Sequence, residues 1–159
     1  MVSLMWCCKQ KDGIKLIEPS DNLSLSYMQM ADNALGTMNR ERKYNLTFAI
    51  SAGYYSMYYS LYSVLMKLGV KCEIHSCTLE FMKVLLSEFY TKEDFKIISK
   101  AFDLRNIAQY YVDKVIDTKE SDMIMSKAPL FVNTSKDVLS KINESDVKKI
   151  RDSLKGLSG

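Results

Sequence analysis

Residues 45–68 restrict the possible folds of this chain more than any other segment. At about 100° per residue, a helix there places its aliphatic residues on one stripe and its tyrosines on more than one side. The stripe consists of Leu46, Ile50, Met57, Leu61, Val64, Leu65 and Leu68. One tyrosine row, which borders the stripe, is Tyr54, Tyr58 and Tyr62, and a second row is Phe48, Tyr55 and Tyr59. A surface helix needs only one apolar stripe, so this helix is central or lies at a subunit interface.

The tyrosine rows have two interpretations. They are typical of a core helix with amphipathic rings at its edges, since a tyrosine can bury its ring and keep its hydroxyl paired. They also fit a dimer face made by Tyr55, Tyr59 and Phe48, or a platform on which nucleobases stack. The two interpretations therefore assign the tyrosines of residues 45–68 either to the core or to a binding surface.

The rest of the chain predicts further helices. Its 159 residues include only 6 glycines and 2 prolines, which favours helices over a many-stranded sheet. Helices are expected over about 20–38, 78–90, 91–114 and 121–142, with Pro129 kinking or splitting the last, and over 145–157. Residues 3–18 predict a β-hairpin, because two apolar runs, 4–8 and 14–17, flank Asp12-Gly13.

The expected fold is therefore all-α, an up-and-down helical bundle with a small N-terminal β-hairpin. We expect one domain over residues 1–159. Within it, the hairpin extension covers 3–18, the bundle covers 20–142, and a C-terminal helix or tail covers 144–159.

Composition indicates an ordinary soluble protein. The net charge of +3 permits contact with nucleic acid without demanding it. The apolar start is too short for a secretory signal, and no apolar run reaches the length of a membrane span. We therefore expect a cytoplasmic protein that has no membrane contact. Its four cysteines, at positions 7, 8, 72 and 77, are then expected to be reduced thiols.

Arg105 is the most unusual residue of the later helices. It falls in the middle of an apolar helix face, among Ile98, Ala101, Phe102, Leu104, Ala108, Val112 and Val115. A guanidinium on such a face is costly unless it is paired and hydrogen-bonded. Gln109, one turn on, can meet it there. The alternatives are a snorkelling or ion-paired arginine, and an arginine that meets a phosphate or a partner carboxylate in a cleft.

No motif in the sequence specifies a cofactor or a metal site. Cys72, His75 and Cys77 have a spacing that is uncommon for zinc, so we expect no metal. His75 is the only histidine, and no glycine-rich phosphate loop occurs. No cofactor is expected.

Several motifs taken together resemble the HEPN superfamily, most closely its small archaeal and bacterial members that partner a nucleotidyltransferase. One motif is the run from Ala49 to Tyr59, which reads AISAGYYSMYY, followed by Leu65–Val70 and then His75. Another is Arg105 to Tyr110, which reads RNIAQY, where the family has Arg-x-x-Ala-Asp-Tyr. The resemblance covers about residues 20–142. It implies a helical bundle that dimerises and brings two arginine motifs toward a shared cleft.

The resemblance also bears on catalysis. In ribonuclease members of the superfamily, four to six residues separate the arginine from a following histidine, and this chain has Tyr110 or Tyr111 where that histidine would be. Tyrosine, with a pKa near 10, is a poor general base at neutral pH. In some members a tyrosine two places after that histidine receives AMP, but the matching position here is Val112. The resemblance therefore implies a binding role rather than an enzyme, unless His75 enters the cleft from elsewhere in the dimer.

Three hypotheses follow. The first is a homodimeric, non-catalytic module that binds a nucleotide, RNA or a minimal nucleotidyltransferase, as in toxin–antitoxin pairs. The second is a diverged, metal-independent ribonuclease that uses the Arg105–Tyr110 motif, and the third is a structural helical scaffold. The predicted ligand-binding residues are Arg105, Asn106, Gln109, Tyr110, Tyr111 and His75. No catalytic residue is predicted.

Overall fold

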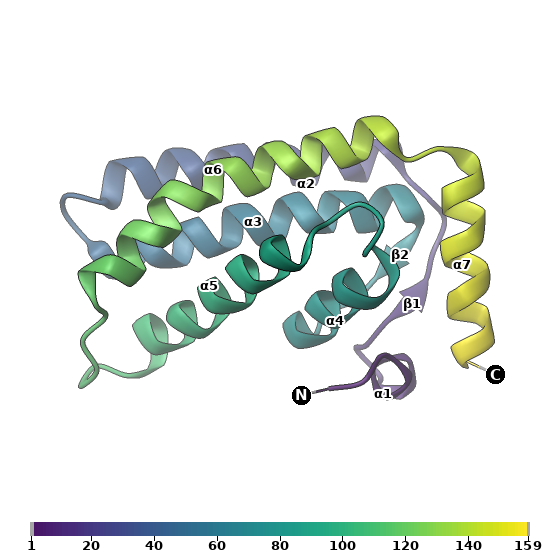
Figure 1. Cartoon of the computed structure of the whole chain (residues 1–159), viewed down its shortest axis with the longest axis horizontal. Helices are drawn as coiled ribbons and strands as arrows, with labels where there is room; N and C mark the ends of the chain where they lie inside the picture. The colour runs from purple at the N-terminus through teal and green to yellow at the C-terminus, as the bar shows by residue number, and fades with distance from the viewer. Residues whose placement is uncertain (1, 159) are drawn as a thin grey trace.

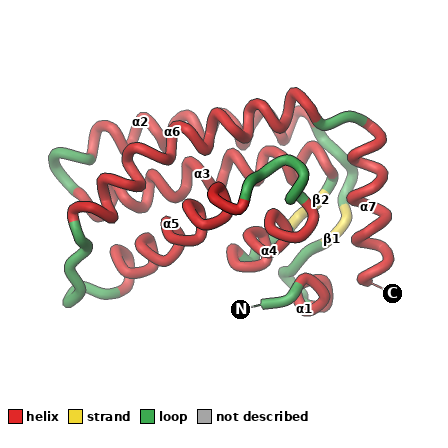
Figure 2. The backbone as a smooth tube through the Cα atoms, in the orientation of Figure 1, coloured by secondary structure: helices red, strands yellow, loops and turns green. Residues whose placement is uncertain are grey.

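Four long helices form the body of the molecule. The structure, a computed structural model, describes residues 2–158. The four helices are α2 (Asp21–Glu41), α3 (Leu46–Leu68), α5 (Lys92–Tyr110) and α6 (Thr118–Lys141). α3 packs against each of the other three, and they surround it (Figure 1). The prediction of an all-α bundle with a small β element is confirmed (Figure 2).

Shorter elements gather at one end of this bundle. They are α1 (Leu4–Lys9), β1 (Lys15–Leu16), β2 (Val70–Lys71), α4 (His75–Leu85) and α7 (Glu144–Ser158). β1 and β2 pair antiparallel, with Lys15 opposite Lys71 and Leu16 opposite Val70. The N-terminus and α7 lie at this end, away from the loop that joins α5 to α6 (Figure 1).

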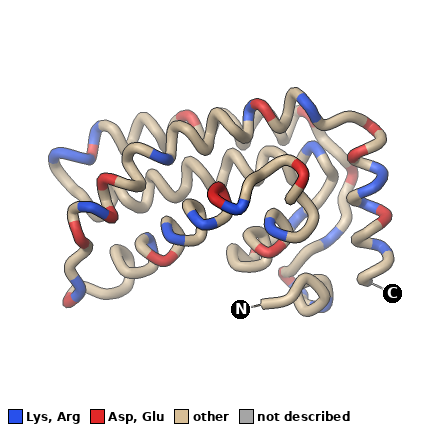
Figure 3. The backbone as a smooth tube through the Cα atoms, viewed as in Figure 1, with Lys and Arg blue, Asp and Glu red and all other residues tan. Residues whose placement is uncertain are grey.

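The central position of α3 follows from its sequence. Asn45 caps it by accepting a hydrogen bond from the backbone N–H of Phe48. Gly69 ends it with a φ of 70°, a left-handed conformation that glycine adopts without a steric penalty. Most of its side chains are buried, and Lys67 is its only charged residue, as the nearly uncharged tube of α3 shows (Figure 3). Of the two positions predicted for this helix, the structure gives the central one.

The predicted hairpin over residues 3–18 is wrong in its first half. Ser3 caps a helix there by accepting a hydrogen bond from the N–H of Trp6, and α1 occupies the expected first strand. The turn at Gly13 then folds back onto α1, where the N–H of Ile14 donates to the carbonyl of Cys7. The second expected strand does form, but its partner is β2. Short apolar runs are ambiguous between strand and helix, which explains the error.

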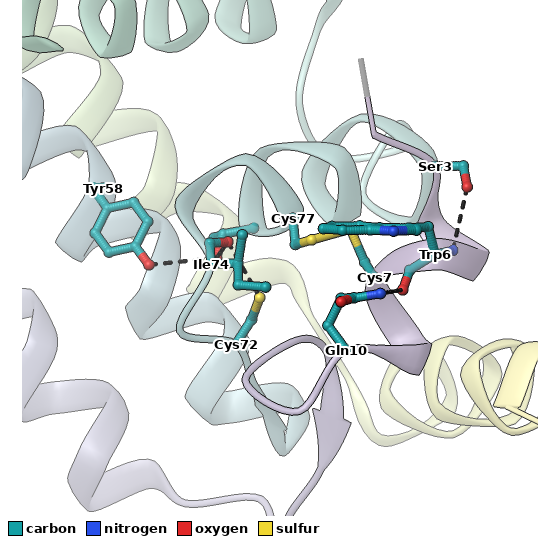
Figure 4. Close-up of a disulfide and its surroundings, with 9 residues drawn as sticks. Ser3, Trp6, Cys7, Gln10, Tyr58, Cys72, Ile74 and Cys77 are labelled. Carbon is teal, nitrogen blue, oxygen red and sulfur yellow. Dashed lines mark hydrogen bonds between the residues drawn. A yellow bond between two sulfur atoms is a disulfide. The ribbon is translucent and has the colours of Figure 1, made fainter.

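The expectation of four reduced cysteines is also wrong. Cys7 on α1 and Cys77 on α4 form a disulfide, and both residues are fully buried (Figure 4). Cys8 and Cys72 are free thiols. The two cysteines are 70 residues apart in the sequence. Their pairing depends on how α1 packs against α4, so it could not be predicted from the spacing.

The helices predicted after residue 19 all form, and their limits differ from the predicted ones by up to five residues. α4 begins at His75, three residues before the predicted start, and ends at Leu85. α5 ends at Tyr110 instead of near residue 114. α6 continues past Pro129 as one helix. No helix in the described part of the chain is both long and apolar enough to cross a membrane.

Candidate functional site

Arg105 lies where α5 crosses α3, and its side chain is half-buried. One terminal nitrogen, Nη2, donates a hydrogen bond of 2.5 Å to the hydroxyl of Tyr55 on α3. The other, Nη1, donates to the amide oxygen of Asn106, its neighbour on α5, at 2.9 Å. Both acceptors are uncharged, so they orient the guanidinium without neutralising it.

Aromatic rings surround the same guanidinium. Its central carbon lies 5.2 Å from the ring centre of Tyr55, 5.8 Å from that of Tyr54 and 5.9 Å from that of Tyr110. Each ring offers a negative face to a cation, and such contacts are worth about 0.5–2 kcal/mol. Tyr54 is fully buried, whereas Tyr110 is 65% exposed. The guanidinium therefore lies between a buried aromatic layer and a ring that faces solvent.

No carboxylate pairs with Arg105 among residues 2–158. Its Nε is buried and has no hydrogen-bond partner in that part of the chain. A guanidinium has five N–H donors, and protein acceptors take two of them here. A half-buried cation with spare donors and no counter-ion favours an anionic partner from outside the chain.

Arg105 and the side chains around it form what we call the Arg105 cluster. His75 belongs to this cluster, although it comes from a different part of the sequence. It is the first residue of α4. Its ring stacks on Tyr58 with centres 4.1 Å apart and planes 3° from parallel. Its Nδ1 lies 2.6 Å from the hydroxyl of Tyr54, the ring that also faces Arg105. Phe102 of α5 contacts both rings, Tyr54 and His75.

The electrostatics of the cluster keep its titratable groups neutral. Burial, with the nearby Arg105 cation second, lowers the pKa of His75 from 6.5 to about 4. Burial raises the pKa of Tyr54 and of Tyr58 well above the ordinary value. At neutral pH the imidazole and both phenols are therefore uncharged, and Arg105 carries the only charge among these residues.

The structure brings together some of the predicted site residues and separates others. Arg105, Asn106, Tyr110 and His75 share the cluster. Gln109 is exposed. The contact with Arg105 that we predicted for Gln109 is made by Asn106. Tyr111 is the C-cap residue that follows α5, and its ring packs instead under the Lys114 ammonium, which is 4.3 Å from the ring centre.

The predicted dimer-interface residues also have different surroundings. Phe48 is 64% exposed. Tyr59 is half-buried, with its ring 5.5 Å from Tyr55 and 6.3 Å from Tyr27. The hydroxyl oxygen of Tyr55 accepts the hydrogen bond from Arg105 inside the chain. No partner chain is needed to explain the position of Tyr55.

Sequence reasoning missed the roles of Tyr54, Tyr58 and Phe102. The spacing of these residues could have indicated their roles. Tyr54 and Tyr58 are one turn apart on α3, and Phe102 is one turn before Arg105 and Asn106 on α5. Among the described residues, no three His, Cys, Asp or Glu side chains are arranged to hold a metal ion. Cys77 is engaged in the disulfide, so the spacing of Cys72, His75 and Cys77 does not form a ligand set.

Comparison with known proteins gives one informative similarity. No family model matches the chain. A protein of the archaeon Methanocaldococcus jannaschii, named "Putative toxin MJ0142", is 29% identical to it over 97 residues. The match covers 58% of this chain and 64% of that protein, so it spans less than two thirds of the relative.

Proposed function

We propose that this chain is a binding module of a toxin-like system, in which Arg105 takes a phosphate group of a nucleotide or of RNA. The observation that carries the proposal is the Arg105 guanidinium, half-buried without a counter-ion among residues 2–158. Arginine binds phosphate in a fork geometry with two parallel N–H donors, and Arg105 has donors to spare. The HEPN resemblance of the sequence and the name of the archaeal relative support the same class of function.

The surrounding rings suit the rest of such a ligand. Tyr110 presents an exposed ring beside Arg105. Proteins bind single-stranded nucleic acid with exposed aromatic rings beside cationic side chains, because every base has a π-face that can stack on such a ring. His75, uncharged at neutral pH, adds a polar edge without adding repulsion or attraction.

Fluorescence anisotropy with a labelled single-stranded RNA tests this proposal. We expect the wild-type protein to bind and Arg105→Ala to lose affinity about tenfold or more, because one charge-assisted phosphate contact is worth about 1.5–3 kcal/mol. Lys148→Ala is the matched control, since Lys148 carries the same charge on the exposed face of α7, at the other end of the bundle (Figure 1). Equal affinity of the Arg105→Ala variant and the wild type would contradict the proposal.

A second candidate function, a metal-independent ribonuclease, is favoured by one specific observation. His75 lies in the Arg105 cluster of its own chain, and its Nδ1 is already paired with Tyr54. With a proton on Nδ1, the free Nε2 can accept a proton from a ribose 2′-hydroxyl while Arg105 holds the phosphate. The low pKa of about 4 makes this imidazole a weak base, so slow cleavage is the expected behaviour.

An RNA cleavage assay without metal separates the two candidates. The binding module predicts no cleavage by the wild type and gain of cleavage by Tyr110→His, which restores the arginine-to-histidine spacing of the superfamily. The ribonuclease predicts cleavage that both Arg105→Ala and His75→Ala abolish. Cleavage that survives in both variants would contradict the second candidate as well.

A homodimer and a minimal nucleotidyltransferase partner complete the proposal. Phe48, exposed on α3, and Tyr59, half-buried about three turns further along the same helix, supply apolar area for the dimer. Light scattering should then give about twice the chain mass of 18.3 kDa. A monomer at micromolar concentration would remove the dimer from the proposal and leave the Arg105 site intact. A structural scaffold remains the outcome if neither RNA nor a nucleotidyltransferase binds.

A further inference from the structure

The buried disulfide reaches close to the proposed site. Cys77 is in the first turn of α4, two residues after His75, and its sulfur is bonded to Cys7 of α1. Figure 4 shows this bond between α1 and α4, with Cys72 and Ile74 on the segment that leads into α4. The cross-link therefore anchors the helical turn on which His75 is placed.

The N-terminal end of that turn has no side-chain cap. The residue before α4, Ile74, has no side chain that can cap the helix, and no side-chain capping bond forms there. Inside the turn, the hydroxyl of Thr78 donates to the Ile74 carbonyl at 3.4 Å. The thiol of Cys72 donates to the same carbonyl at 3.3 Å. Both contacts are long. The disulfide is the covalent restraint on the start of α4, and it acts beside the backbone bonds from Cys77 and Thr78 to the Ile74 carbonyl and the contacts of His75 with Tyr54 and Tyr58.

On the other side of the bond, α1 depends on the same cross-link. It has only six residues, and an isolated helix of that length is unstable in water. Its outer side is open to solvent, with Met5 52% and Trp6 45% exposed. Both sulfurs are buried, so a reductant reaches them when α1 lifts away, and a short terminal helix is the kind of segment that opens locally.

We propose that the Cys7–Cys77 disulfide is a redox control on the Arg105 site, with the oxidised form holding His75 against Tyr54 and Tyr58. This inference rests on the proposed function for its consequence, ligand binding, but not for its structural effect. The chemistry is thiol–disulfide exchange with a dithiol. Two electrons and two protons pass from the dithiol to Cys7 and Cys77, the bond between their sulfurs breaks, and the dithiol closes into its own disulfide. Exchange in the opposite direction restores the protein disulfide.

Reduction then acts on the site through α4. When the bond opens, the first turn of α4 frays, and His75 leaves its stacked position on Tyr58 and its contact with Tyr54. The buried layer beneath the Arg105 guanidinium includes Tyr54, so that layer loosens with it. The ligand consequently binds the oxidised form more tightly than the reduced form.

The test compares oxidised protein with protein treated with excess dithiothreitol, and thiol alkylation with mass spectrometry verifies the state of each sample. Because the chain has one histidine, a single imidazole resonance reports on His75 in an NMR titration. We expect its pKa to move from about 4 toward 6.5 on reduction. We also expect amide exchange in residues 4–9 and 75–79 to accelerate about tenfold, and affinity for the labelled RNA to fall about tenfold.

Two double variants provide the controls. Cys7→Ser/Cys77→Ser should show the reduced behaviour without dithiothreitol and should not respond to it. Cys8→Ser/Cys72→Ser removes the two free thiols and should respond as the wild type does.

The outcomes separate the two proposals. An unchanged His75 pKa and unchanged exchange in residues 75–79 after reduction would overturn the redox control, as would global unfolding or a purified protein with four free thiols. If the His75 pKa and exchange shift but RNA affinity does not, the control over binding is wrong while the proposed function stands. If neither form binds RNA, the proposed function fails, and the His75 resonance still decides whether the disulfide governs the cluster.

Discussion

Two arginines of this protein are half-buried, but their partners differ completely. Arg151 of α7 directs one terminal nitrogen at the backbone carbonyls of Ile17, Leu68 and Gly69, at 2.8, 3.1 and 2.8 Å. Two of these carbonyls lie at the C-terminal end of α3, where the helix dipole is negative. Arg105 has one tyrosine hydroxyl and one amide oxygen as acceptors, and its Nε has no partner among residues 2–158.

The difference shows which cation serves the fold. Arg151 fills the acceptors that the end of α3 leaves open and joins α7 to α3 and to Ile17, the residue after β1, so the negative end of the α3 dipole stabilises its charge. Arg105 has two side-chain acceptors, a hydroxyl and an amide oxygen, and its remaining donors stay available to a ligand. Burial alone does not distinguish the two residues, whereas the number of their acceptors and the helix dipole at Arg151 do.

The largest expected change in stability comes from the disulfide, which lies at the same end of the molecule as Arg151. Cys7→Ser/Cys77→Ser should lower the free energy of unfolding by about 4 kcal/mol, because the native cross-link spans 70 residues and restricts the unfolded chain. Urea denaturation of the variant and the oxidised wild type measures the difference. The Cys8→Ser/Cys72→Ser variant should lose much less, and an equal loss in both would show that packing, not the cross-link, sets the value.

The two arginines should respond oppositely in stability. Arg151→Ala should cost about 2 kcal/mol, since it leaves three carbonyls without their charged donor. Arg105→Ala should change the free energy of unfolding by less than about 1 kcal/mol, because removing an unpaired half-buried charge also removes its desolvation cost. Denaturant melts of both variants make the comparison. A larger loss of stability in Arg105→Ala than in Arg151→Ala would show that Arg105 serves the fold.

A smaller effect should appear in the pH dependence of stability. His75 has a folded pKa of about 4, below its ordinary 6.5, so the unfolded chain binds a proton in this window that the folded chain does not. Its contribution to stability is complete above pH 6.5 and is lost as pH falls toward 4. Melting temperatures between about pH 7 and about pH 5 should fall more steeply for the wild type than for His75→Gln. Parallel profiles would show that the Arg105 cluster does not depress the His75 pKa.

Sequence reasoning predicted the bundle because its evidence is local. The helical period of residues 45–68, the stop at Gly69 and the cap at Thr91 each act within a few residues of the chain. Arg105 could be singled out for the same reason, since one buried charge on an apolar face is visible in a single helix.

The rest depends on contacts between distant segments. His75 joins the cluster because α4 starts beside α3, and Cys7 meets Cys77 because Ser3 starts a helix where a strand was expected. Neither placement follows from spacing in the sequence. The pairing of β1 with β2 likewise required knowledge of where the end of α3 lies.

The central claim, that Arg105 is the free cation of the pair and binds a phosphate, is tested most directly by ligand-induced stabilisation. A ligand that binds only the folded state raises the melting temperature according to its affinity and concentration. Excess AMP should raise the melting temperature of the oxidised wild type and of Arg151→Ala, while leaving Arg105→Ala unchanged. An equal rise in Arg105→Ala, or no rise in the wild type, would contradict the account.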